Sequence, residues 1–460
     1  MFKDENLESI NIKSDTLSEK YVRDQSCQTK PIELKNQYSQ AILRLSVDVQ
    51  TELSHTPASV TRLRVDNSKK LETFMLTVYP LVSEQLTANV RSHAFDDYEL
   101  DELNISENIE CKVTLTCPEQ KEEDKLDITC LSWNSIGSIV ASALGKFEHD
   151  TWCTHPAQIH IWNVNKQENS TPNKTIDADN CVTAIAFHPS DPPILVSGDF
   201  SGKIHVWDLS KEDNILVAFS GKETETHHEA VNQLVWIPST GSVLNFISTG
   251  SDGNIFLWMY NKLKQHLGLI STFQLSSDVI PRNVRKSSMR SGTALGITCA
   301  SLTSNQNKDI LVGTENGGVF CCKEKTNGGG YTIIAFGSHE ATVNSIDSSQ
   351  AMKTFFLTCS LDMCIHVYQE SQSTPLHKVD PMSGYLFAVQ WSPTKHVFYV
   401  STAASNILVY QIEDDEVHLK NTINVGNKKV CINSLAVNKE DKIASADSNT
   451  TIKIWEFKND

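Results

Sequence analysis

Several features that would reveal a function directly are missing from this sequence. No stretch approaches about 18 consecutive apolar residues, so we expect no transmembrane helix and no membrane insertion. The opening MFKDENLESI has two acids among its first five residues and no apolar segment, unlike a secretory signal peptide. Basic residues number 40 against 56 acidic ones, for a formal net charge of −16. This balance argues against a nucleic-acid partner.

Sequence motifs for catalysis are also missing. The chain has no GxxxxGK[S/T] phosphate loop, no GxGxxG after a strand, no HExxH and no GxSxG. Its 12 cysteines are scattered through 460 residues without a compact framework, which predicts reduced thiols. We therefore expect no catalytic residues and no cofactor. An enzyme stays open only as the alternative of another class, without a motif to support it.

Glycine and tryptophan are missing from the first 132 residues, although the chain contains 20 glycines and 8 tryptophans. Charge is divided as well, because residues 93–125 hold 11 acids and only 3 bases. Residues 1–65 are too polar to bury a core. These shifts predict a disordered arm over 1–65, a helix over 66–92, an acidic linker over 93–108 and a folded domain over 109–460.

The predicted helix has one apolar face, with spacings of three and four residues. Its members are Leu71, Phe74, Met75, Val78, Val82 and Leu86. Pro80 disfavours helical geometry at the preceding residue, so we expect a kink or two short helices. Two interpretations stay open: the face packs on the following domain, or it docks into a groove of a partner.

From about residue 128 to the end, the chain repeats one pattern seven times. Each unit has an alternating strand, a polar turn, a strand of small residues, a tight turn and a strand that usually ends in an aromatic residue. The terminal position is held by Trp162, Trp207, Trp258, Cys322, Tyr368, Tyr410 and Trp455, with gaps of 42 to 64 residues. A period of about 40–45 residues with four strands per unit is typical of WD repeats. We therefore predict an all-β, seven-bladed WD-repeat β-propeller.

Closure of such a ring needs a strand from one end of the domain to complete the blade at the other end. Ile109–Cys117 (IECKVTLTC) precedes the first full repeat and has the apolar alternation of a strand. We predict that it pairs with the last blade and removes an exposed edge.

Two groups of histidine and aspartate resemble catalytic residue types. His228, Asp252 and Trp258 fall in the third repeat, and His339 and Asp362 in the fifth. Their positions match the internal hydrogen-bond set of WD repeats, so we interpret all five as structural locks of the blades.

Two further segments attract attention without a firm assignment. His149, Cys153 and His155 have the spacing of metal ligands, but no fourth ligand lies nearby in the sequence, so we expect no metal. The long gap Asn261–Leu295 holds a basic run, Arg282–Arg290. This insertion is either a binding loop or a disordered one.

Taken together, the arm, amphipathic helix, acidic connector and seven-bladed propeller resemble the dynein intermediate chains. The phrases SHAFDDYEL, ITCLSWNSIGSIVASALG, HDTWCT and YLFAVQWSP are similar to those of the cytoplasmic dynein 2 branch. The resemblance implies a non-catalytic subunit of the motor for retrograde intraflagellar transport and cilium assembly. It also implies that the propeller binds the dynein 2 heavy chain and that the helix binds a roadblock-type light chain. A second intermediate chain is a further expected partner, and the expected locations are cytoplasm, cytoskeleton and cilium, at axoneme and basal body.

Two tripeptides in the arm resemble anchors for the small hub-type dynein light chain. They are Cys27-Gln28-Thr29 and Val49-Gln50-Thr51, which contain all the Gln-Thr dipeptides of the chain. A disordered strand of this kind pairs with a sheet edge of the light chain and fills pockets with alternate side chains. Cysteine stands where the first anchor usually has another residue.

Two other binding functions compete with this interpretation. Propellers also serve as substrate receptors of cullin-type ubiquitin ligases, which often carry Trp-Asp-x-Arg after a blade. The single Trp-Asp here is followed by Leu209 and Ser210 instead of arginine. An axonemal dynein intermediate chain would have the same architecture, so that only the local phrases separate the two branches.

Overall fold

A computed structural model describes residues 68–91, 109–118, 126–149, 152–153, 155–166, 171–221, 226–239, 241–285, 290–305, 309–325, 330–413, 415–426 and 430–457. The chain divides into two units, Met1–Glu102 and Leu103–Asp460, which we describe separately. Among these described residues, the first unit contains a helix and the second is built of strands.

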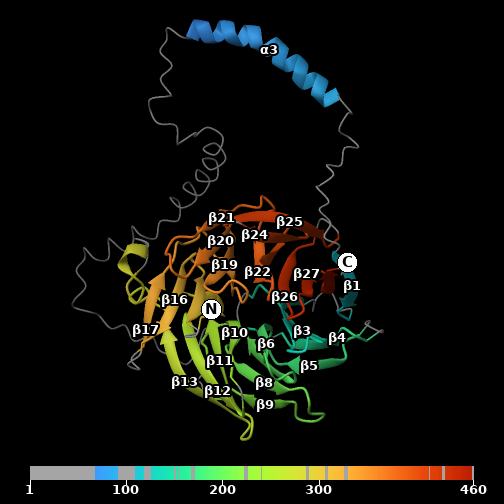
Figure 1. Ribbon diagram of the computed structural model, residues 1–460, viewed down its shortest axis with the longest axis vertical. Helices are drawn as coiled ribbons and strands as arrows, with labels where there is room; N and C mark the ends of the chain where they lie inside the picture. The colour runs from blue at the N-terminus through green and yellow to red at the C-terminus, as the bar shows by residue number, and fades with distance from the viewer. Residues whose placement is uncertain are drawn as a thin grey trace, which may run out of the picture. The chain divides into compact units, whose positions relative to one another are not determined.

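In the first unit, helix α3 runs without interruption over Ser68–Arg91. Pro80 lies inside it, and Figure 1 shows the helix as one curved ribbon. Proline removes one backbone donor and crowds the preceding turn, which bends a helix without necessarily ending it. The alternative of two short helices is therefore wrong.

In the described part of the second unit, 28 strands form seven four-stranded antiparallel sheets, which we number as blades in chain order. Blade 1 contains β2 (Asp127–Trp133), β3 (Ile139–Gly145), β4 (Ala157–Asn163) and β5 (Lys174–Ala178). Blade 2 contains β6 (Val182–Phe187), β7 (Ile194–Asp199), β8 (Ile204–Asp208) and β9 (Leu216–Phe219). Blade 3 contains β10 (Val231–Ile237), β11 (Val243–Gly250), β12 (Asn254–Asn261) and β13 (His266–Gln274).

The remaining blades repeat this order from the inside of the ring outwards. Blade 4 contains β14 (Ile297–Leu302), β15 (Ile310–Thr314), β16 (Val319–Glu324) and β17 (Tyr331–Ala335). Blade 5 contains β18 (Val343–Ser348), β19 (Phe355–Ser360), β20 (Ile365–Gln369) and β21 (His377–Val379). Blade 6 contains β22 (Leu386–Trp391), β23 (Val397–Thr402), β24 (Asn406–Glu413) and β25 (Glu416–Asn424). Blade 7 contains β26 (Ile432–Val437), β27 (Ile443–Asp447), β28 (Thr451–Phe457) and β1 (Ile109–Thr116).

The blades follow one another around a ring, and the first strand of the domain closes it (Figure 1). Strand β1 pairs antiparallel with β28, from Ile109 opposite Phe457 to Thr116 opposite Thr451. Leu115 of β1 is fully buried. The predicted closing strand is thus confirmed, and the architecture is the predicted seven-bladed propeller.

The core lies between neighbouring blades. The seven terminal residues of the sequence repeats all fall on the third strand of their blades, and each is at most 6% exposed. Because side chains alternate along a strand, one face of each blade packs against the preceding blade and the other against the following one. A single blade would leave both faces in water, so the blades are stable only as a ring.

A side chain at the second residue of the innermost strand, or the third in β2, joins most blades to the next. The pairing register shifts at this residue in all seven innermost strands of the described domain, which marks a β-bulge. In five blades the side chain there donates to a backbone carbonyl of the next blade: Thr129 to Val182, Thr183 to Val231, Asn232 to Ile297, Thr298 to Val343 and Asn344 to Leu386. In blade 6 the position is Phe387, which has no donor.

Candidate functional site

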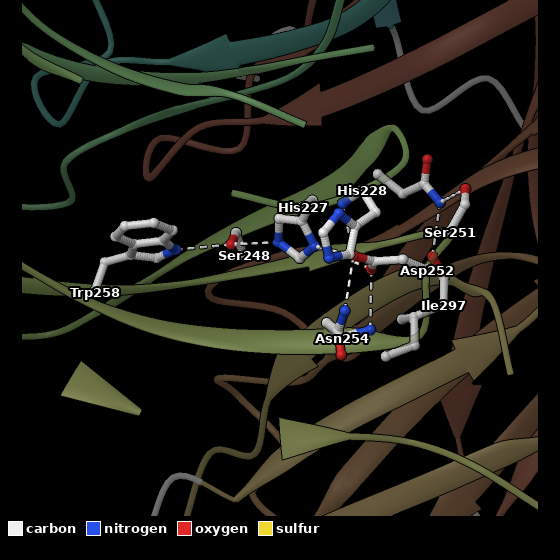
Figure 2. Close-up of polar contacts among 9 residues, drawn as sticks. His227, His228, Ser248, Ser251, Asp252, Asn254, Trp258 and Ile297 are labelled. Atoms are coloured by element: carbon white, nitrogen blue, oxygen red, sulfur yellow. Dashed lines mark hydrogen bonds and ion pairs between the residues drawn. The ribbon is translucent and has the colours of Figure 1, made fainter. Parts of the chain in front are cut away.

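In blade 3, histidine, serine, aspartate and tryptophan form one continuous hydrogen-bonded chain (Figure 2). Trp258 Nε1 donates to Ser248 Oγ over 2.8 Å, and that oxygen lies 2.8 Å from His227 Nε2. On the other side of the ring, His227 Nδ1 lies 3.0 Å from Asp252 Oδ1. The chain links the segment before β10 to β11, to the β11–β12 turn and to β12, so it holds four parts of the blade in one geometry.

The sequence prediction placed His228 in this lock, and that assignment is wrong. The ring in the lock is that of His227, while His228 contributes only its backbone N–H, which donates to Asp252 Oδ2 over 3.1 Å. Position relative to the next strand would have identified the correct residue. His227 precedes Val231, the first residue of β10, by four positions, as His339 precedes Val343 of β18.

Blade 5 contains the corresponding group with a threonine in place of serine. His339 Nδ1 lies 2.9 Å from Asp362 Oδ2, and His339 Nε2 lies 2.7 Å from Thr358 Oγ1. The structure thus brings together His339 and Asp362. Tyr368 replaces tryptophan and donates its hydroxyl to Gly337 O over 2.6 Å.

The electrostatics of both groups favour a fixed structure over proton transfer. Burial by itself would raise the pKa of Asp252, but the hydrogen bonds and charge of His227 and the bonds from Asn254 lower it well below the usual value. Burial lowers the pKa of His339 against the opposing effect of Asp362. His227 and His339 are at most 2% exposed. Neither ring is presented to a substrate.

The innermost strands of the seven blades line a central channel of about 610 Å³. Its carboxylate, Asp347 on β18, accepts hydrogen bonds from the backbone N–H groups of Trp391 (2.8 Å) and Ser348 (2.9 Å). Burial raises the pKa of Asp347 to about 7, against the lowering effect of these two bonds. Because Trp391 belongs to β22, this carboxylate also connects blade 5 to blade 6.

The insertion Asn261–Leu295 is structured in much of its described part. It supplies β13, the outermost strand of blade 3, and a short 3-10 helix, Arg282–Val284. Leu275, Ile280 and Leu295 are buried with the blade 4 core. Arg285 donates to the carbonyls of Asp278 and Ile280. The interpretation of a wholly disordered loop is therefore wrong, while residues 286–289 lie outside the described residues.

Helix α3 presents most of the predicted apolar face to solvent. Leu71, Phe74, Met75, Val82 and Leu86 are between 44% and 59% exposed. Val78, the remaining member, is half-buried. The predicted anchors Cys27, Gln28, Thr29, Val49, Gln50 and Thr51 lie outside the described residues.

None of the helices in the described part of the chain has the length and apolar character to cross a membrane. A family model for the WD domain, G-beta repeat, matches residues 170–208, 221–259 and 330–369. The first match ends with β8, the third strand of blade 2, while the second covers most of blade 3 and the third most of blade 5. These matches agree with the WD-repeat propeller.

Curated relatives match far more of the chain than these repeats. The cytoplasmic dynein 2 intermediate chain 2 of Mus musculus is 28% identical over 94% of this chain and 84% of its own length. The Homo sapiens protein of the same name is 28% identical over 84% of this chain and 76% of its own length. The dynein axonemal intermediate chain 4 of Rattus norvegicus is 22% identical over 73% of this chain and 42% of its own length.

These comparisons confirm the resemblance predicted from the sequence phrases. They also confirm the prediction that the chain is not an enzyme, because the matched proteins are named as intermediate chains and the matched domain is a WD-repeat domain. The chain is a seven-bladed WD-repeat propeller protein that is similar, over most of its length, to the intermediate chains of cytoplasmic dynein 2.

Proposed function

We propose that this chain is a non-catalytic intermediate chain of the cytoplasmic dynein 2 motor. In this role it links the heavy chain to light chains for retrograde intraflagellar transport and cilium assembly. The observation that carries the proposal is the extent of the similarity. The match to the mouse dynein 2 chain spans 94% of this sequence and must therefore extend beyond the propeller. Matches to dynein 1 and axonemal intermediate chains span 54% to 78%.

The direct test is recovery of partners from ciliated cells. The tagged full chain, isolated under native conditions, is expected to carry the dynein 2 heavy chain, light chains and a second intermediate chain. It should lie in the cytoplasm, on the cytoskeleton and in cilia, at axoneme and basal body. Recovery of an axonemal heavy chain instead would support the axonemal alternative. Recovery of neither would refute the proposal.

Loss of the chain provides an independent test. A scaffold without catalytic chemistry acts through the complex that it assembles, so a null cell should build short or swollen cilia with transported material at the tips. Live imaging of particle movement is expected to show impaired return from tip to base. Normal return in the null would contradict the transport role.

For helix α3 we propose docking onto a roadblock-type light chain. The exposed apolar residues of its face support this proposal, because a helix in a groove is held by side chains at such spacings. Truncation of a buried large apolar side chain typically costs about 2–5 kcal/mol. The pair Phe74→Ala and Val78→Ala should therefore abolish recovery of this light chain and leave the heavy chain bound.

The matched control is Leu76→Ala in the same helix. Leu76 is 72% exposed and, at 3.6 residues per turn, lies roughly 130° around the helix from the predicted face. It should leave light-chain recovery unchanged. Equal recovery with the double variant and the control would show that this face is not the docking surface.

For the arm we propose that the two Gln-Thr segments bind hub-type light chains. A short strand that must be ordered on binding has weak affinity. A dimeric light chain that bridges two strands gains avidity of about 10²–10⁴-fold. Replacement of Gln50 and Thr51 by alanine should weaken binding strongly, and replacement of Gln28 and Thr29 should weaken it less.

Titration calorimetry with a peptide of residues 20–56 measures the number of sites. We expect two light-chain binding sites per peptide, one for each Gln-Thr segment. The peptide with all four residues replaced by alanine should not bind. A stoichiometry of one would remove the Cys27 segment from the proposal, and no binding would remove both segments. Neither result would affect the proposal for α3.

A further inference from the structure

The structure supplies the fourth ligand that the sequence around His149 lacks. His149, Cys153 and His155 lie in the loop between β3 and β4, and Cys181 lies directly before β6. One donor atom from each of the four residues falls within 4.8 Å of all the others. Twenty-five residues separate His155 from Cys181 in the chain, so only the folded blade brings them together.

The geometry of the group is close to that of a tetrahedral site. Zinc–sulfur and zinc–nitrogen bonds of about 2.3 and 2.0 Å place a sulfur and a nitrogen ligand about 3.6 Å apart. Cys153 Sγ lies 3.9 Å from His155 Nδ1, so this pair would approach by only a few tenths of an ångström on binding zinc. The other pairs of donor atoms lie within 4.8 Å, so the widest of them would approach by up to about 1 Å. The fold also packs the end of β3 closely against Cys181. A Cβ at Gly145, the last residue of β3, would lie 3.1 Å from Cys181 Cβ.

A backbone N–H group faces each of the two sulfur atoms. The backbone N–H of Cys181 donates to Cys153 Sγ over 3.3 Å, and the backbone N–H of Lys146 donates to Cys181 Sγ over 3.3 Å. N–H donors of this kind stabilise negative charge on ligand sulfur and orient it. Cys181 is fully buried, while the other three residues are half-buried.

His149 provides an observation independent of the spacing. Both nitrogens of its ring are buried, and neither has a hydrogen-bond partner among the described residues. A buried polar atom without a partner is costly and calls for an explanation. Phe200 stacks on this ring at 3.8 Å between centroids and holds it in place. Coordination of a metal ion would give one of the two ring nitrogens of His149 a partner.

We propose that His149, Cys153, His155 and Cys181 form a structural zinc site in blade 1. Two sulfur and two nitrogen ligands in tetrahedral arrangement are the donor set that zinc prefers. All four protein ligands are present, so no position is left for a reacting water. The ion fastens the β3–β4 loop to the segment before β6. It also fixes the display of Trp152, which is 83% exposed beside Cys153.

The test uses the purified full chain, reduced and loaded with zinc sulfate, then freed of loose metal by gel filtration. Elemental analysis is expected to find one zinc per folded chain. Cys181→Ser and His155→Asn should each lose it. The control Cys431→Ser, which alters a half-buried free thiol on a different blade, should retain it. Equal retention by the Cys181 variant would overturn the proposal.

Cobalt substitution identifies the ligands spectroscopically. The cobalt-loaded chain should show the strong visible bands of a tetrahedral ion and thiolate charge transfer in the near ultraviolet, and both should disappear in Cys153→Ser. A spectrum without thiolate bands would refute the site. A Cys153–Cys181 disulfide in the chain isolated without reductant, with no zinc bound, would also refute it.

Thermal unfolding of the natural chain tests the site even if a variant of one of its ligands fails to fold. A chelator should lower the melting temperature of the zinc-loaded natural chain, because a metal that binds the folded state stabilises it. The same chelator should leave the melting temperature of Cys181→Ser unchanged. An equal response in both proteins would refute the proposal.

Discussion

Replacement of Ser248 by alanine in blade 3 tests whether the lock works as a connected chain. Ser248 Oγ accepts a hydrogen bond from Trp258 Nε1 over 2.8 Å and lies 2.8 Å from His227 Nε2. Ser248 is fully buried. An indole nitrogen can only donate, so the serine hydroxyl has its own proton to give to the histidine. Alanine removes both contacts and leaves two buried polar groups without partners.

Blade 2 provides a matched reference in Ser197→Ala. Trp207 Nε1 donates to Ser197 Oγ over 2.8 Å. His205 lies opposite this serine on β8, but among the described residues no histidine ring forms a hydrogen bond with the Ser197 hydroxyl. Each buried group left unsatisfied costs about 1–3 kcal/mol, so Ser197→Ala should cost about 1–3 and Ser248→Ala about 2–6 kcal/mol. The difference, about 1–3 kcal/mol, measures the histidine half of the lock.

The assay is equilibrium unfolding of the full chain in urea, followed by tryptophan fluorescence and circular dichroism. We expect the midpoint to fall for both variants and to fall further for Ser248→Ala. Equal shifts, or a larger shift for Ser197→Ala, would refute the reasoning and show that His227 and Asp252 add nothing through the serine.

Three further predictions follow from the fold. Deletion of residues 1–105 should leave a cooperatively melting domain, whereas deletion of 1–120 removes β1 and should cause aggregation or loss of stability; equal melting would exclude closure by β1. Gly202 has φ +86° and a Cβ there would lie 2.1 Å from the carbonyl oxygen of the lock histidine, so Gly202→Ala should lower the melting temperature markedly. Gly241→Ala, at φ +116° with no atom within 4 Å, should cost less, and the two melting curves compare them directly. The pKa of Asp347 is raised to about 7, so the folded chain keeps a proton that the unfolded chain releases near pH 4. The contribution of this group to stability is therefore fully present below about pH 4 and is lost as the pH rises through 7. The loss in the free energy of unfolding is up to about 4 kcal/mol. Urea unfolding at pH 5 and 8 should therefore show a larger loss for the natural chain than for Asp347→Asn, and identical losses would contradict the assignment.

The sequence by itself determined the repeat architecture, because each strand of a blade shows a local alternation of apolar and polar residues. The third strands were identified by their terminal residues, from Trp162 to Trp455, and all seven fall on the expected strand. The closing strand was predictable for a related reason, since Ile109–Cys117 alternates as a strand but has no neighbour in its own part of the chain. Local phrases outside and inside the propeller likewise indicated the similarity to dynein intermediate chains that the comparisons found.

Side-chain contacts between distant segments were decided only by the tertiary structure. Residue type alone does not separate His227 from His228, and the turn before β10 determines which ring points into the blade. Cys181 lies far along the chain from His149, and the packing of the β3 end against the segment before β6 brings the two together. A loop has no short repeat period that fixes where its side chains point, so the fold sets these directions and the sequence pattern does not.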